Sequence, residues 1–301
     1  MATIADKLTY LNGTKTAIKN ALVSKGVVIE DTDTFRSYAD KIENISGEPA
    51  TRFGASLDTF FGEVDENGVL NKPTAPTALN FAGVTEIGED VLQRAFYCNT
   101  SITSVDLSSL TTVGGCGLYY AFYGCTSITS VDLSSLQTVD IWGLRNAFEG
   151  CRITSLDLNS LESIGQGGMT NAFGACKSIT SVDLSSLTTV DSQGMESAFC
   201  LCTGITSVDL SSLQSVGAEG LKKAFYDCYR LATISFPSLT EVSTHSFSSN
   251  TDNDTNNLAF SGCTALTKIH FRADMQETIE ACDGYADKFG ATNATISFDL
   301  Q

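Results

Sequence analysis

The sequence is poor in basic residues and in histidine. Lysine and arginine together number 18 against 35 aspartates and glutamates, which gives a formal net charge of −17, and histidine occurs only at His245 and His270. Such an acidic chain is unsuited to nucleic acid, whose recognition needs a basic face, and to anionic lipid surfaces. We therefore expect no nucleic-acid partner.

The sequence also lacks long apolar runs. No segment approaches the roughly 20 consecutive apolar residues of a membrane-spanning helix, so we expect no membrane insertion. The first residues, MATIADKLTYLNGTKTAIKN, mix charges with apolar positions and lack the uninterrupted apolar core of a secretory signal peptide. As written, the chain is not expected to enter the Sec pathway.

Catalytic and metal-binding motifs are missing as well. The sequence has no HExxH motif, no phosphate-binding glycine loop and no CxxC pair, and Cys200 and Cys202 form only a CxC. Its many aspartates sit in equivalent settings, which does not separate their pKa values as acid–base catalysis requires. A glycosidase-like use of two of them is the remaining enzymatic alternative. We expect a non-enzymatic protein with no cofactor and no bound metal.

What the sequence does contain is an internal repeat. The decapeptide SITSVDLSSL occupies residues 101–110, 127–136 and 178–187, with near copies at 152–161 and 204–213. The repeats follow one another at 25 or 26 residues, with a last step of 35, when they are aligned on the Ala-Phe pairs that begin at Ala95, Ala121, Ala147, Ala172, Ala198, Ala224 and Ala259. A fixed period in this range is typical of a solenoid, in which each coil buries its core only against its neighbours.

Each repeat combines a strand pattern with a return segment. Val105 and Leu107 alternate with polar residues, which is β-strand periodicity. Before the Ala-Phe pair, the spacing of Leu144 and Phe148 predicts a short helical return with both side chains buried. We predict that the cysteine of the AFxxC motif is a small buried residue rather than a disulfide partner or metal ligand. It recurs as Cys125, Cys151, Cys176, Cys202, Cys228 and Cys263.

An aspartate stands at one outward position of five predicted strands. In a parallel stack these carboxylates would lie about 5 Å apart and would repel by about 0.8 kcal/mol per neighbouring pair at water-like dielectric. Three interpretations stay open: a solvated polar stripe, a recognition face for a cationic or hydroxyl-rich partner, or calcium bridging. The candidate binding residues of this row are Asp106, Asp132, Asp157, Asp183, Asp209 and, at its far end, His270.

The return segments vary from coil to coil. Tyr119, Tyr120 and the single tryptophan, Trp142, are candidates for stacking on sugars or contacting a partner, with packing inside the protein as the alternative. We expect the equivalent pairs of the other coils to be exposed as well. These pairs are Arg145-Asn146, Thr170-Asn171, Glu196-Ser197 and Lys222-Lys223.

The two ends of the chain differ from the repeat. Apolar residues stepping by three and four form a heptad seam near the N-terminus, which predicts either a helical hairpin packed on itself or an oligomerisation and anchoring module. The candidate anchoring residues are Ile4, Leu8, Leu11, Ile18 and Leu22. The predicted domains are a helical module at 1–47, a connector and N-terminal cap at 48–78, the solenoid at 79–271 and a C-terminal cap at 272–301.

The repeat resembles the leucine-rich repeats of the BspA-like (Treponema pallidum type) class, whose units carry an LxxVxL-type strand, an Ala-Phe pair and often a cysteine. The resemblance covers roughly residues 79–271. It implies an α/β repeat fold, namely a leucine-rich-repeat solenoid with a parallel β-sheet face, preceded here by a small N-terminal helical module.

Both ends carry a second resemblance. The runs ADKLTYLNGTKTAIKNALVSKGV and DTDTFRSYADKI resemble an N-terminal module of tail-fibre, head-fibre and other virion-associated proteins of phages and prophages in gut bacteria. The closing run LTKIHFRADMQETIEACDGYADKFGATNATISFDL resembles the C-terminal end of repeat proteins from the same setting.

Together these resemblances imply a virion structural protein of fibre or decoration type. Its N-terminal module would bind other virion proteins, and its solenoid would face a host-surface glycan or protein. A homo-oligomer, with a trimer as the first expectation, would fit this role. The alternatives are a BspA-like adhesin at the bacterial cell surface and an intracellular scaffold in the cytoplasm.

Overall fold

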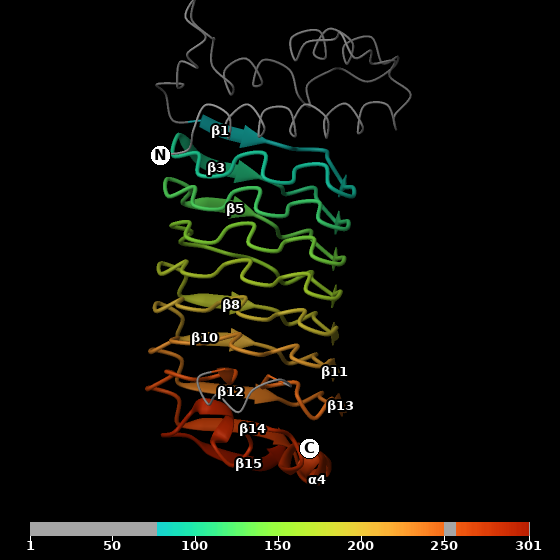
Figure 1. The fold of residues 1–301 in the computed structure, drawn as a ribbon, viewed down its shortest axis with the longest axis vertical. Helices are drawn as coiled ribbons and strands as arrows, with labels where there is room; N and C mark the ends of the chain where they lie inside the picture. The colour runs from blue at the N-terminus through green and yellow to red at the C-terminus, as the bar shows by residue number, and fades with distance from the viewer. Residues whose placement is uncertain (1–76, 250–256, 301) are drawn as a thin grey trace, which may run out of the picture.

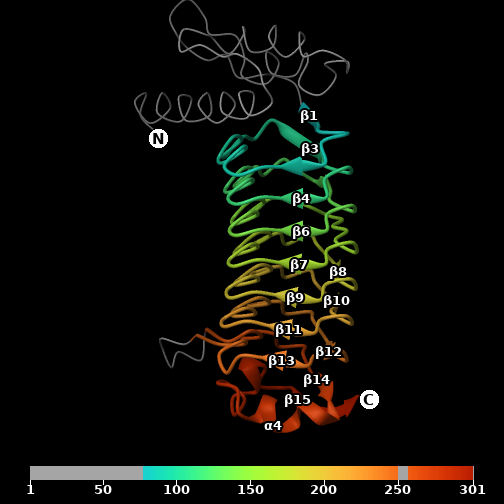
Figure 2. The same ribbon diagram turned by 90° about the vertical axis from the view of Figure 1, so that its right-hand side faces the viewer.

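The computed structural model describes residues 77–249 and 257–300, which wind into a parallel β-solenoid of about eight coils (Figure 1). The coils stack along one axis, with three short parallel sheets on one side of the stack and a seven-stranded parallel sheet on another (Figure 2). The predicted solenoid with a parallel β-sheet face is confirmed. The predicted N-terminal helical module and its anchoring residues lie outside the described residues.

The side with the three short sheets carries the predicted aspartate row and is called the strand face below. Neighbouring coils pair in parallel and in register, so that Asp106 lies beside Asp132 and Asp183 beside Asp209. Isolated bridges at Ser155 and Asp157 continue the stack across the one coil without a named strand here. The strands of this face are β1 (Thr77–Asn80), β3 (Ile102–Asp106), β5 (Ser130–Asp132), β8 (Ser181–Asp183), β10 (Ser207–Asp209), β12 (Thr233–Phe236), β14 (Lys268–Arg272) and β15 (Thr295–Leu300).

The seven-stranded sheet is built from two-residue strands whose second residue points inward. Its order is β13-β11-β9-β7-β6-β4-β2, so the strands follow the coils without crossing. Ile87 pairs with Val113, so the segment before the first complete repeat also forms a coil of the solenoid. The strands are β2 (Glu86–Ile87), β4 (Thr112–Val113), β6 (Thr138–Val139), β7 (Ser163–Ile164), β9 (Thr189–Val190), β11 (Ser215–Val216) and β13 (Glu241–Val242).

The predicted helical return is wrong. Leu144 and Phe148 are both buried, but the N–H of Phe148 donates to the carbonyl of Ala172 in the next coil instead of to Leu144. The returns are runs of tight turns in which N–H groups alternate between a carbonyl three residues back and one in the next coil. A left-handed residue recurs every fourth position, as at Trp142 (φ 54°), Asn146 (55°) and Gly150 (77°), and such residues interrupt an α-helix.

These returns stack into a third surface, called the turn face below. Because every second N–H group donates to the next coil, the return is hydrogen-bonded along the solenoid axis much as a sheet is. The backbone is the same in each coil while the outward side chains differ, so the turn face is a constant framework for variable residues.

The core is a ladder of identical contacts. The phenylalanine of each Ala-Phe pair stacks on that of the next coil, with centroid distances from 5.0 Å between Phe96 and Phe122 to 5.9 Å between Phe225 and Phe260. The six AFxxC cysteines are buried and free, which confirms their prediction as small core residues. Burial raises the pKa of these thiols, to about 12 for Cys125 and Cys202.

The last coil closes with short helices and a strand. Between β14 and β15 lie η2 (Ala273–Met275), α4 (Gln276–Glu280) and η3 (Lys288–Gly290), of which Met275, Ile279 and Phe289 are buried. β15 lies at the end of the strand face (Figure 1).

Candidate functional site

The aspartate row on the strand face is a series of turn closures. The Oδ1 atom of Asp132 accepts a hydrogen bond from the N–H of Ser134 (3.0 Å), and the other four aspartates make the same bond to the residue two positions on, at 2.9 or 3.0 Å. Asn80 does the same with Ala82 at 2.7 Å. This is an Asx turn, which holds the chain where it leaves the strand.

This structural role was not predicted, although the Asp-x-Ser/Asn spacing is typical of an Asx turn. One oxygen of each carboxylate is engaged by the backbone. Asp106 is partly exposed and the other four are exposed, so recognition by this row stays a prediction beside the solvated stripe.

His270 extends the row in register, beside Ser235 on one strand and Ser297 on the other. Its Nδ1 lies 2.8 Å from Oδ1 of Asp299 and 2.9 Å from Oγ of Ser297. The nearby His270 holds the pKa of Asp299 below its ordinary value through this hydrogen bond. The cluster therefore fastens β14 to β15, and its role in binding stays a prediction.

An aromatic cluster occupies the N-terminal end of the turn face. Tyr119 and Tyr120 meet edge to face at 4.7 Å, and Tyr120 lies 5.4 Å from Tyr123. Tyr123 in turn stacks on Tyr97 at 5.0 Å, and Tyr97 is 44 % exposed. The guanidinium of Arg94 lies over the rings of Tyr119 and Tyr120, at 5.9 and 5.4 Å from the ring centroids. This set is called the tyrosine cluster below.

Of these five residues, Tyr119 and Tyr120 were predicted from the sequence. Tyr97, Tyr123 and Arg94 were not, because they come from neighbouring coils or from the other side of an Ala-Phe pair. The repeat itself places Tyr97 and Tyr123 at the same position of successive coils, because each directly follows the phenylalanine of an Ala-Phe pair.

Trp142 lies one coil further along the turn face. It is 39 % exposed, its indole packs against the backbone of Gly167, and the guanidinium of Arg145 lies 5.9 Å from its ring. A Cβ on Gly167 would come within 2.5 Å of the indole, so this glycine makes room for the tryptophan. Trp142 therefore packs partly against the next coil, and the exposed part of its side chain remains available to a partner.

The expectation that all the variable pairs are exposed is wrong for three residues. Asn146, Thr170 and Ser197 are buried. Thr170 Oγ1 donates to the carbonyl of Gln193 in the next coil (3.2 Å), whereas the amide of Asn146 donates to the carboxylate of Glu149 in its own coil. In these three pairs only the other residue is available to a partner.

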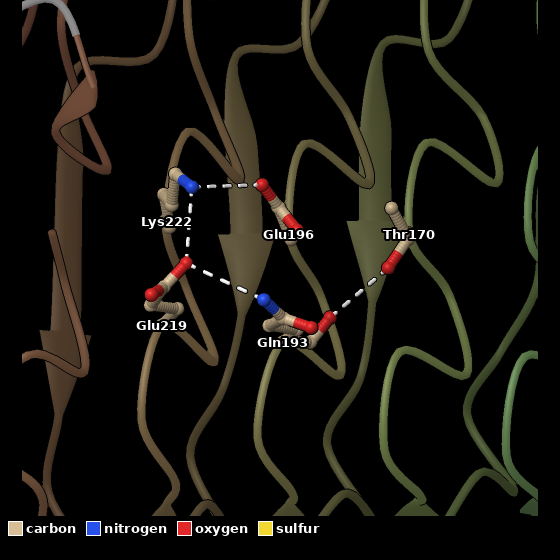
Figure 3. A network of polar contacts seen from close by, with 5 residues as sticks. All are labelled: Thr170, Gln193, Glu196, Glu219 and Lys222. Carbon is tan, nitrogen blue, oxygen red and sulfur yellow. Dashed lines mark hydrogen bonds and ion pairs between the residues drawn. The ribbon is translucent and has the colours of Figure 1, made fainter. Parts of the chain in front are cut away.

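A polar network crosses the middle of the turn face (Figure 3). Lys222 Nζ lies 3.0 Å from Glu219 and 3.1 Å from Glu196, and Glu219 also approaches the amide of Gln193 at 3.5 Å. Burial opposes the charge of Lys222, but the two carboxylates outweigh it and raise the pKa of the amine. The charged groups, which are mostly buried, join two successive coils, and the hydroxyl of Thr170 extends the network to a third by donating to the carbonyl of Gln193.

No metal or membrane site emerges from the described residues. In residues 77–249 and 257–300 no group of three or more histidine, cysteine, aspartate or glutamate side chains is placed to hold a metal ion. Over the same residues, no helix has the length and apolar character needed to cross a bilayer.

Comparison with known proteins identifies the repeat. A family model described as "BspA type Leucine rich repeat region" matches residues 85–212 and 120–254. No curated protein matches the chain.

Solved structures that match include a TLR13–ssRNA13 complex, at 15 % identity and a TM-score of 0.25, over 62 % of this chain and 32 % of that one. The pneumococcal vaccine antigen PcpA matches at 14 % sequence identity with a TM-score of 0.27, over 70 % of this chain and 65 % of that chain. A leucine-rich-repeat protein of Leptospira interrogans matches at 9 % sequence identity with a TM-score of 0.25, over 66 % of this chain and 61 % of that chain. The chain thus spans about a third of the first and less than two thirds of the other two.

Proposed function

The chain belongs to the BspA-type leucine-rich-repeat family, and on that premise we propose that it is a non-enzymatic solenoid that binds another protein through its turn face. The observation that carries this proposal is the contrast between the two faces. The strand face repeats one aspartate and its serines in coil after coil, whereas the turn face varies its side chains on a constant backbone. A specific partner needs a surface that differs from place to place.

The tyrosine cluster is the best candidate for the centre of that surface. Tyrosine, tryptophan and arginine are the residues that most often dominate binding energy at protein interfaces. One face of Tyr97 and one face of Tyr123 are taken up by their stacking, and Arg94 lies over Tyr119 and Tyr120. These contacts hold the rings in place, and the exposed part of Tyr97 remains for a partner.

The role in the organism follows from the resemblance of the chain ends. We propose a virion protein of fibre or decoration type, mounted on other virion proteins by residues 1–47, that displays the solenoid to a protein of the host surface. A BspA-like adhesin at the bacterial surface and an intracellular scaffold are equally consistent with the fold and the family.

Binding of the fluorescently labelled chain to intact cells of the host strain tests this proposal. The variant Tyr97→Ser/Tyr120→Asn takes its residues from the equivalent positions of other coils, Ser261 and Asn171, so the fold should tolerate both. We expect at least tenfold weaker binding, because two interface aromatics together contribute a few kcal/mol.

The matched control is Asp132→Asn/Asp157→Asn/Asp183→Asn on the strand face. Asparagine keeps the side-chain oxygen that accepts the backbone hydrogen bond of the Asx turn, so the control removes the charge of the aspartates and leaves the turns intact. Unchanged binding is expected. Loss of binding in the control, with the tyrosine variant unaffected, would assign recognition to the aspartate row instead.

A further inference from the structure

A second group of aromatic and basic side chains lies on the turn face, toward the C-terminal end of the solenoid. Tyr226 takes the same repeat position as Tyr123 of the tyrosine cluster, directly after the phenylalanine of an Ala-Phe pair. The amine of Lys223 lies 5.8 Å from the centre of the Tyr226 ring, so a cation lies beside a tyrosine ring in both clusters. Tyr229 in the same coil is 45 % exposed. The distal cluster, as it is called below, consists of Lys223, Tyr226 and Tyr229.

Asp227 helps to hold the distal cluster in place. Its carboxylate lies against the backbone of Gly262 in the next coil, where an added Cβ would collide with it. The negative charge of Asp227 raises the pKa of the Tyr229 phenol, which keeps that phenol protonated as a hydrogen-bond donor. The cluster is therefore partly ordered before a partner arrives, and this lowers the entropic cost of binding.

The two clusters are four coils apart along the solenoid. The phenylalanine stack of the core marks this separation between Phe122 and Phe225, with ring centroids 5.1 to 5.8 Å apart at each step. The clusters are therefore about 20 Å apart, a distance that an extended chain covers in about six residues. Because successive side chains of an extended chain alternate in direction, two residues six positions apart point to the same side.

The surface between the clusters carries one charged group at the tyrosine position. The three intervening coils have Glu149, Gly174 and Cys200 there. Gly174 is buried and Cys200 is partly buried, so neither obstructs a chain laid from one cluster to the other. The carboxylate of Glu149 accepts a hydrogen bond from the amide of Asn146, and burial raises the pKa of this carboxyl group. A cation placed beside Glu149 would stabilise its charged form.

Resting on the proposed function, we propose that the partner protein contributes an extended segment that lies along the turn face, with an apolar side chain on each cluster and a basic side chain beside Glu149. The two apolar residues of this segment are about six positions apart. Its basic residue complements the one carboxylate at the tyrosine position between the clusters and the net charge of −17 of the chain. The two anchors reinforce each other, because binding at the second cluster is intramolecular once the first is engaged.

Selection of random peptides from a display library against the full chain tests the proposal. We expect the enriched peptides to carry two apolar residues about six positions apart, with lysine or arginine between them. Tyr226→Ser takes the residue of the equivalent position Ser261 and should weaken their binding at least tenfold. Glu149→Gln keeps the acceptor for Asn146 and should remove the preference for a basic residue. The matched control is Asp157→Asn, which removes the same charge from the strand face of the same coil and should leave binding unchanged.

The repeat also supplies a ruler for the distance between the clusters. Duplication of residues 177–202, one complete repeat, inserts a coil between the clusters and keeps the residues of both. The spacing between the apolar residues of the enriched peptides should then increase from about six to about eight positions. A spacing that the duplication leaves unchanged, peptides without a recurrent spacing, or a selection that enriches no peptide would overturn the proposal.

The two proposals fail in different ways. Peptides that lose binding to Tyr97→Ser/Tyr120→Asn but bind Tyr226→Ser as tightly as the native chain would overturn the second anchor and leave the proposed function standing. Peptides that bind both variants as tightly as the native chain would contradict the proposed recognition by the turn face as well.

Discussion

The thiol of Cys176 donates a hydrogen bond to the main-chain carbonyl of Phe148 in the preceding coil, with Sγ and O 3.2 Å apart. The same carbonyl accepts the N–H of Cys151 at 3.1 Å. The bond recurs in each coil from Cys125 to Cys263, at 3.0 to 3.3 Å. The cysteine thus fills a small space beside the phenylalanine stack and satisfies the second lone pair of a buried carbonyl.

The cysteine ladder predicts a loss of stability in alkali. Burial raises the pKa of Cys202 from 9.0 to about 12, and Cys125 and Cys263 shift alike. The folded state then holds these protons more tightly than the unfolded state, so their contribution is complete below pH 9 and is lost as the pH rises toward 12. The free energy of unfolding from urea titrations should fall above pH 9.

The variant Cys202→Ala supplies the control for this prediction. It should reduce the slope of unfolding free energy against pH by about 1.4 kcal/mol per pH unit between pH 9 and 12, because one titrating thiol is removed. A slope equal to that of the unmodified chain would mean that the ladder thiols do not set the alkaline limit.

The Asx turns predict different outcomes for two changes at one aspartate. Asp183→Ala removes the acceptor of the Ser185 N–H bond and should cost about 1 kcal/mol of unfolding free energy. Asp183→Asn keeps an acceptor and removes repulsion from Asp157 and Asp209, so its stability should equal or exceed that of the native chain. Equal losses in both variants, measured by urea unfolding, would show that the carboxylate acts through its charge.

A left-handed residue on the turn face predicts a stabilising change. Leu201 has φ 62° and is 38 % exposed, and the equivalent position holds glycine at Gly124 and Gly150. Leu201→Gly should raise the unfolding free energy by about 0.5–1 kcal/mol, because glycine adopts this conformation without steric cost. Leu201→Ala, which keeps the Cβ as Ala175 does at φ 56°, should change stability little, with both variants measured by urea unfolding.

The polar network of the turn face predicts a rescue experiment. Lys222→Met leaves the mostly buried carboxylate of Glu219 without its closest cation and should cost about 1–3 kcal/mol in urea unfolding. Adding Glu219→Gln removes the stranded charge and should recover most of that loss. Additive losses in the double variant would show that the two side chains do not act as a pair.

The repeat made the buried residues of the core predictable from the sequence. The backbone conformation of the return segments was not predictable in the same way. A period of 25 or 26 residues sets the stacking, so burial of Phe148 and Cys176 and the register of the aspartates follow from alignment alone. The return was mistaken for a helix because Leu144 and Phe148 share a face both in a helix and in a run of tight turns. Only the left-handed residues separate the two, and at Trp142 and Asn146 they are not glycines.

The surfaces were predictable in part. Asp106 and its equivalents lie in the expected outward row. The prediction considered only the charge of these side chains and not their hydrogen bonds to the backbone in Asx turns. Tyr119 and Tyr120 were found as neighbours in sequence, whereas Tyr97, Tyr123 and Arg94 join them only through the stacking of coils. Contacts across coils depend on side-chain directions that a one-dimensional pattern does not contain.

The most direct test of the proposed role is mass spectrometry of density-purified phage particles from the strain that encodes the chain. We expect stoichiometric peptides from this protein in the particles, with a copy number relative to the major capsid protein that separates a fibre from a decoration protein. Absence from the particles, with the protein present on or inside uninfected cells, would contradict a virion role and support the adhesin or the scaffold.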